Sequence, residues 1–128
     1  MRMIPATVLK LSVLALSTLA LSALAVAADE IGDAHREAVT GRDTYWTCLA
    51  QEYSLDSNRG MSGEDFTHHI ADVCPSERQY FRVALIDYLA MQFPNAEAGA
   101  NMTTANDAIA LAQKDIVTAF IRHKAASK

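Results

Sequence analysis

Apolar residues recur at helical spacing in four segments of the chain, and no segment shows the alternation that is typical of a strand. The first segment covers 29–54 and is followed by LDSNRGMS at 55–62, a polar, loop-forming stretch. Asp29, Glu30 and Asp33 stand at its start, where the helix dipole favours acids. Its apolar stripe consists of Ile31, Ala34, Ala38, Tyr45, Cys48 and Leu49, widened by Trp46, Ala50 and Tyr53. The pattern predicts a long helix.

Two further helices are predicted on either side of Cys74. The first covers 63–74, with Ser62 as its N-cap and Asp65 at the position of a capping-box acid. The next covers 75–93, because Pro75 suits a first helical turn and resists a helix interior. The apolar face of the shorter helix holds Phe66, Ile70 and Val73, and that of the longer one Phe81, Ala84, Leu85, Tyr88 and Leu89.

A fourth helix is predicted over 104–124, after the alanine-rich connector NAEAGANMT. Thr104 precedes it, and Asp107 stands three residues later as the matching box acid. Its stripe is made of Ile109, Ala112, Ile116, Ala119 and Phe120, and the cations at its end are Arg122, His123 and Lys124. The fold class is therefore all-α, a small bundle of about four helices after an N-terminal signal helix.

The N-terminal segment has the pattern of a secretory signal peptide. Arg2 and Lys10 give a positive start, and an apolar run follows from Leu11 to Ala25. Small residues then allow cleavage after residue 27 or 28. We expect 1–27 to be a signal peptide and 28–128 to be a single helical domain, periplasmic or secreted. A retained membrane anchor is the alternative.

Removal of the signal segment makes the chain more acidic. The segment contains two of the 11 basic residues and none of the 15 acidic ones, so the net charge changes from −4 to −6. An acidic chain without a basic cluster is a poor ligand for nucleic acid and for anionic membrane surfaces. We therefore expect no nucleic-acid partner, and no membrane contact after cleavage.

Two adjacent histidines precede Cys74 in the stretch FTHHIADVC. Ligands on one helix need a spacing of three or four, whereas His68 and His69 stand six and five residues from Cys74. Chelation by these residues together is thus unfavourable. We expect His69 to be partly buried beside the core and His68 to face solvent, where it and Asp72 could share a weak surface ion. No metal site is predicted here.

The two cysteines are better explained by a disulfide. Cys48 and Cys74 are the only cysteines, both stand on predicted apolar faces, and the chain carries an export signal. Their separation of 26 residues suits two antiparallel helices joined by a loop. No C-x-x-C spacing is present that would support a redox role. The sequence predicts a structural Cys48–Cys74 disulfide.

No motif in the chain supports catalysis or a cofactor. Nucleophile-elbow, phosphate-loop, dinucleotide and zinc-protease patterns are all missing from the sequence. Glu52 and Asp56 are interpreted as exposed charges at a helix end, and His35 as a surface histidine. We therefore predict no enzyme activity, no catalytic residue and no cofactor.

Two short stretches, YWTC at 45–48 and VCPSERQYFR at 73–82, resemble the small periplasmic acid-stress chaperones. The resemblance implies a short, exported, all-helical protein with one disulfide that opens at low pH and binds unfolding clients. The cysteines here are much closer together than in that family. The layout also resembles that of uncharacterised small exported helical bacterial proteins with one cysteine pair.

The function predicted from these observations is binding without catalysis. We expect an exported helical module, stapled by one disulfide, that binds a protein partner or associates with itself. The expected contact points are those of Tyr53, Tyr80 and Phe93 that are exposed, because aromatic residues are enriched at such surfaces. The alternatives are an acid-responsive periplasmic chaperone and a weak metal-binding protein that uses His68, His69 and Asp72.

Overall fold

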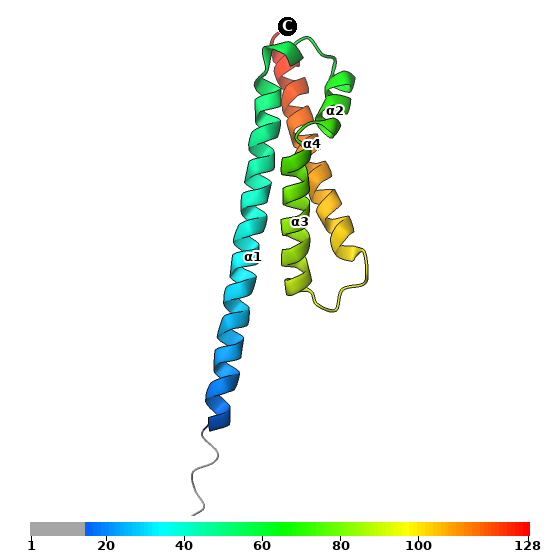
Figure 1. Cartoon of the computed structure of the whole chain (residues 1–128). Helices are drawn as coiled ribbons and strands as arrows, with labels where there is room; N and C mark the ends of the chain where they lie inside the picture. The colour runs from blue at the N-terminus through cyan, green and yellow to red at the C-terminus, as the bar shows by residue number, and fades with distance from the viewer. Residues whose placement is uncertain (1–14) are drawn as a thin grey trace, which may run out of the picture.

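The computed structural model describes the backbone of residues 15–128 and the side chains of residues 23–128, and it is all-α (Figure 1). Residues 1–14, where the expected signal segment begins, lie outside this range. The elements are α1 (Ala15–Ser54), the 3-10 turn η1 (Asp56–Asn58), α2 (Gly63–Asp72), α3 (Pro75–Gln92) and α4 (Ala100–Ala126). The prediction of a bundle of about four helices is confirmed over the described residues.

The helices α1 and α3 pack side by side in opposite directions (Figure 1). Their register follows from two contacts at opposite ends of α3. Cys48 is bonded to Cys74 just before α3 begins, and the ring of His35 lies 5.1 Å from that of Tyr88 near its end. A residue of α1 and its neighbour on α3 therefore have numbers that sum to about 122.

A close approach of α1 to α3 depends on Gly41. A Cβ atom at this position would lie 2.9 Å from the Cα of Phe81, which is inside the contact distance. Gly41 is buried in the middle of a helix, where glycine costs conformational entropy. Its missing side chain lets the two backbones meet between the disulfide and the far end of α3.

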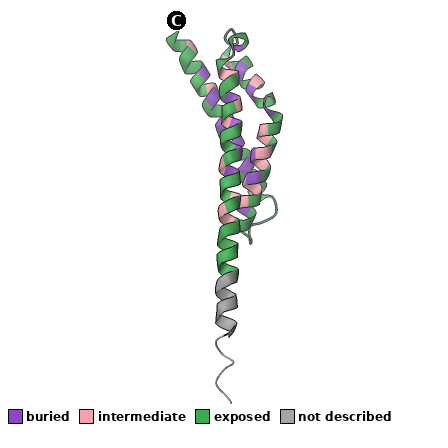
Figure 2. Cartoon of the chain, turned by 60° about the vertical axis from the view of Figure 1, so that its left-hand side comes forward, coloured by how far each residue is buried: buried purple, intermediate pink, exposed green. Residues whose placement is uncertain are grey.

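The buried residues lie between the helices (Figure 2). The main buried cluster includes Cys74 and so extends to the end of the bundle that holds the disulfide. There Phe66 of α2 stacks on Phe120 of α4, with ring centroids 3.9 Å apart. Lys124 covers this contact, since its ammonium lies 5.9 Å from the Phe120 ring and donates to the carbonyl of Met61. The buried cluster consists of Tyr45, Leu49, Phe66, Ile70, Cys74, Phe81, Ile109, Ala112, Ile116 and Phe120.

Two local predictions about helix starts are confirmed. The Ser62 hydroxyl accepts from the backbone N–H of Asp65 at 3.0 Å, as expected of the N-cap of α2. Pro75 occupies the first turn of α3. Both signals are short-range, so neighbouring residues suffice to specify them.

Helix ends were predicted less well. In the described residues the first helix begins at Ala15 rather than at 29, so Asp29 and Glu30 lie inside it and not in its first turn. The second ends at Asp72 instead of 74, and the third at Gln92 instead of 93. A helical segment N-terminal to 29 was expected, but its continuity with the first helix of the bundle was not.

The predicted start of the last helix at Thr104 is wrong, because α4 already begins at Ala100. Gly99, with φ +90°, precedes it in the left-handed region that glycine tolerates. The Thr104 hydroxyl donates to the carbonyl of Ala100 at 3.2 Å, which is the usual bond of a threonine inside a helix. Ala119, predicted in the apolar stripe, is exposed.

Candidate functional site

The Cys48–Cys74 disulfide joins α1 to the start of α3, and the described residues contain no free cysteine. The two Cα atoms are 6.1 Å apart. Cys74 was expected on the apolar face of the preceding helix, but it follows the end of that helix and is the N-cap of α3. Its backbone is left-handed, with φ +56°, a conformation that costs roughly 1–2 kcal/mol outside glycine. The disulfide and Pro75 hold the chain in this turn.

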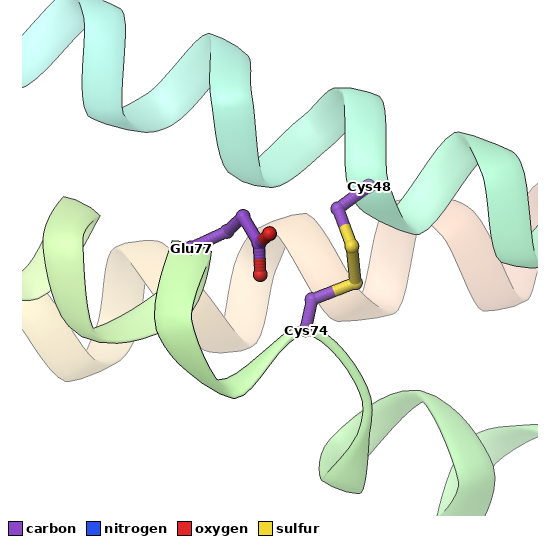
Figure 3. A group of neighbouring side chains, drawn as sticks. All are labelled: Cys48, Cys74 and Glu77. Atoms are coloured by element: carbon purple, nitrogen blue, oxygen red, sulfur yellow. A yellow bond between two sulfur atoms is a disulfide. The ribbon is translucent and has the colours of Figure 1, made fainter.

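Glu77 in the first turn of α3 lies next to the disulfide (Figure 3). Its carboxylate and the two sulfur atoms lie within 4.8 Å of one another. Each sulfur is bonded to the other, so neither is a thiolate that could bind a metal. Glu77 is therefore the single anionic donor of this group, and its place is explained by the helix dipole.

The metal-binding alternative from the sequence receives no geometric support. In the described part of the chain, Cys48, Cys74 and Glu77 form the only group of three or more candidate ligands within 4.8 Å. His68 and Asp72 are exposed, as expected, and His69 is engaged elsewhere. The structure thus does not bring His68, His69 and Asp72 together as one ligand set.

The His69 ring is hydrogen-bonded to Glu52, and Asn58 completes the cluster. His69 Nε2 lies 2.8 Å from Glu52 Oε2. Asn58, which is 4 % exposed, donates through its amide to the carboxylate and to the backbone carbonyl of Glu52, both at 2.9 Å. The three residues come from α2, α1 and η1, so the cluster ties these elements together.

The hydrogen bond from His69 lowers the pKa of Glu52 below its usual value. Partial burial of the carboxyl acts in the opposite direction, and the bond from Asn58 adds to the lowering. Glu52 was predicted to be an exposed charge at a helix end, and this is wrong. Its partner His69 is 17 residues away on α2, beyond the loop that follows α1. No local pattern around Glu52 indicates this pair.

Of the three aromatic contact points expected from the sequence, Phe93 alone is exposed. Tyr53 is half-buried, packs against the core and lies 6.0 Å from the ring of His123. Tyr80 is also half-buried, and its hydroxyl donates to Glu37. Phe93, in contrast, is 55 % exposed. Phe93 is therefore the exposed aromatic among the three candidates.

Phe93 belongs to an apolar surface that we call the tip, defined as residues 91–102 at the connection of α3 and α4. Met91 and Met102 are 45 % and 46 % exposed, and every residue from 91 to 100 is exposed. The tip contains an open hollow of about 470 Å³. Its lining is Gln92, Phe93, Pro94, Asn95, Ala96, Ala100, Asn101 and Thr104. Of the three large apolar side chains, Phe93 thus lines the hollow, and Met91 and Met102 are exposed at the two ends of the same segment.

A second hollow, of about 460 Å³, lies beside the disulfide. It is lined by polar residues of α1, which are Thr40, Asp43, Thr44, Thr47 and Gln51, together with Cys48 and Glu77. Two of the threonine hydroxyls donate to carbonyls of their own helix. This hollow therefore has few free donors and no large apolar side chain, and it is a poorer binding surface than the tip.

No protein-family model matches the chain, and no curated protein or solved structure matches it either. Within residues 15–128, the structure contains no helix with the length and apolar content that crossing a membrane requires.

Proposed function

We propose that this chain is a non-catalytic, exported helical module that binds a protein partner in the periplasm or outside the cell. The observation that carries the proposal is the tip, where Met91, Phe93 and Met102 are each about half exposed and Phe93 lines a hollow. Exposed apolar side chains that cluster next to a concave surface are typical of interaction sites. Single exposed apolar residues would not support such a proposal.

Export is supported by the disulfide and by the N-terminal sequence. A disulfide that joins the only two cysteines of a small chain is expected in an oxidising compartment. The charged start, the apolar run and the small residues before Ala28 are the expected features of an exported precursor.

A non-catalytic role is supported by the way the titratable residues are used. The Glu52 carboxylate is bonded to His69 and Asn58, and both sulfurs are in a disulfide. These groups, which could act as base or nucleophile, instead connect α1 to η1, α2 and α3. Their bonds stabilise the fold that presents the tip.

The test is site-specific photo-crosslinking of the full-length chain in living cells. One variant carries the photoreactive side chain in place of Phe93, and the control carries it in place of Lys114, an exposed residue of α4. We expect a discrete adduct from position 93 that is missing from position 114. The captured protein must then bind the purified, oxidised chain. No adduct at position 93, or equal adducts at both positions, would overturn the proposal.

A second candidate, an acid-responsive chaperone, is favoured by the Glu52–His69 pair. This pair and Asn58 tie α2 to α1 and η1, and α2 covers Phe120 through Phe66. Protonation of Glu52 in acid removes its charge from the pair and loosens this tie. We expect the oxidised chain to suppress aggregation of an acid-unfolded client at pH 2–3 and not at pH 7. A lack of protection at both pH values would remove this candidate.

A further inference from the structure

We infer that the tip binds a cationic amphipathic segment of the partner, an inference that rests on the proposed function. Such a segment presents an apolar face flanked by Lys or Arg, as an amphipathic helix does. The apolar face would contact Met91, Phe93 and Met102, and its cations would lie near the acidic residues at the same end of the bundle. The exposed apolar side chains favour an apolar ligand face, and the nearby carboxylates independently favour a cationic one.

The apolar part of the tip has no partner within the described chain. Phe93 ends α3 and packs into no buried cluster, whereas Phe66, Phe81 and Phe120 all lie in the core. Four backbone hydrogen bonds, from Phe93 to Leu89, Ala96 to Phe93, Ala100 to Glu97 and Thr103 to Gly99, give the connection between α3 and α4 a defined shape. A ligand can therefore meet a formed surface without first ordering this connection.

Five exposed carboxylates lie at the same end of the bundle as the tip because of the register of the helices. Neighbouring residues of α1 and α3 have numbers that sum to about 122, so Asp29, Glu30 and Asp33 of α1 lie at the level of the last turn of α3. Asp87 lies in the last two turns of α3, and Glu97 is in the tip itself. All five carboxylates are exposed. The carboxylates at this end of the bundle therefore come from three separate parts of the chain, which are α1, α3 and the tip.

One cation lies among these acids. Arg36 of α1 forms an ion pair with Asp33, so four carboxylates remain without a neighbouring base at this level. Cleavage after residue 27 or 28, as proposed, would add one amino group here and leave the end acidic. At the disulfide end, acidic and basic residues are mixed. The basic residues at this end include Arg59, Arg78, Arg122, Lys124 and Lys128. The negative charge of the molecule is thus concentrated around the tip.

This combination of charge and apolar surface selects among the possible occupants. A second copy would bring another acidic tip, and an anionic lipid surface would also be repelled. Opposite charge flanking an apolar contact attracts a basic segment and excludes acidic ones. A cationic amphipathic segment is therefore the occupant that fits both features.

The experiment measures binding of three synthetic peptides to the full, oxidised chain by calorimetry at low salt. The first peptide is a Leu/Lys amphipathic helix, the second has the same apolar face with Glu in place of Lys, and the third is a scrambled Leu/Lys sequence. We expect binding of the first alone, and weaker binding as salt screens the exposed charges. Equal binding of the scrambled peptide would show a general charge effect and overturn the inference.

Matched variants locate the binding surface. The tip variant replaces three carboxylates by amides, with the substitutions Glu30→Gln, Asp87→Asn and Glu97→Gln. The control variant does the same elsewhere, with Glu64→Gln, Asp72→Asn and Asp115→Asn, and all six residues are exposed. We expect the Kd to rise about 10-fold for the tip variant and less than about twofold for the control. The second pair is Phe93→Ser, which should abolish binding, and Leu111→Ser, an equally exposed residue on α4, which should not. Equal effects within either pair would overturn the inference.

The outcomes separate this inference from the proposed function. A partner captured at position 93 whose contacting segment is not cationic overturns the inference and leaves the function in place. No capture at position 93 removes the function itself. Dimers that form with rising concentration and are lost in Phe93→Ser would overturn the inference in favour of a second copy as the occupant. Binding to phosphatidylglycerol vesicles that depends on the tip would overturn it in favour of a lipid surface.

Discussion

The two ends of the bundle are built in opposite ways. At the disulfide end, η1, α2 and the ends of α1 and α4 are held by a covalent bond, the Glu52–His69 hydrogen bond and the Phe66–Phe120 stack. At the tip, backbone hydrogen bonds shape the connection, and residues 91–100 are all exposed. Buried contacts are thus concentrated at the disulfide end, so the tip can change in sequence with little loss of stability.

The largest expected effect compares one phenylalanine from each end. Phe66→Ala removes a fully buried ring and should lower the free energy of unfolding by about 3–5 kcal/mol. Phe93→Ala removes a ring that is 55 % exposed and should change it by less than about 0.5 kcal/mol. Denaturant unfolding at pH 7 measures both. A similar loss from the two variants would contradict the division of the molecule into two ends.

The disulfide should contribute almost as much as Phe66. For a separation of 26 residues, its loss in a Cys48→Ser, Cys74→Ser variant should cost about 3.5 kcal/mol by the chain-entropy relation. Relief of the left-handed backbone at Cys74 would reduce this cost. The measurement compares the oxidised chain, the reduced chain and the variant. Reduction should not change the variant, and an unchanged stability on reduction of the natural chain would exclude a stapling role.

A smaller effect is expected where α1 meets α3 between the two ends. Gly41→Ala would bring a methyl group to 2.9 Å from the Phe81 backbone and should cost about 1–3 kcal/mol, because the helices must separate. Gly60→Ala in the loop before α2 meets nothing within 4 Å and serves as the control. Its stability should stay the same or rise slightly. Thermal unfolding of both variants tests the register of α1 against α3, which is the register that places the acidic residues of α1 at the level of the tip.

The smallest effect is a pH dependence at the disulfide end. Because the pKa of Glu52 is lowered in the folded state, its pair with His69 stabilises the fold above the unfolded pKa of about 4.5, and this contribution is lost as the pH falls through the folded value. Glu52→Gln should therefore cost about 1 kcal/mol at pH 7 and progressively less below pH 4. The exposed Asp72→Asn should show no such trend. A constant difference between Glu52→Gln and the natural chain at all pH values would exclude the pair as its cause.

Features set by neighbouring residues could be predicted from the sequence. The apolar stripes, the Ser62 cap and the Pro75 start depend on spacings of a few residues, and the disulfide followed from the number of cysteines. Thr104 misled the prediction of α4, because a threonine with an acid three residues later resembles a cap even when the helix has already begun.

Features that depend on packing between elements could not be predicted in this way. The Glu52–His69 pair joins the end of α1 to α2, so it depends on how the chain folds back after the loop between these helices. The burial of Tyr53 and Tyr80 depends on neighbours from α4 and α1 that no local pattern names. The sequence pointed to Phe93 alone in the tip, since its hollow forms only when residues 92–104 fold between α3 and α4. The acidic residues at the same level come partly from α1.

The unbroken course of α1 through the proposed cleavage site has a consequence for maturation. Residues 23–30 are helical and exposed, so only local hydrogen bonds must open for a peptidase to reach the chain in extended form. Once 1–27 are removed, Asp29 and Glu30 change from mid-helix residues to members of a first turn, next to backbone N–H groups that have lost their partners. Trimming would thus leave a helix end that its own acids already stabilise, without any rearrangement of the bundle.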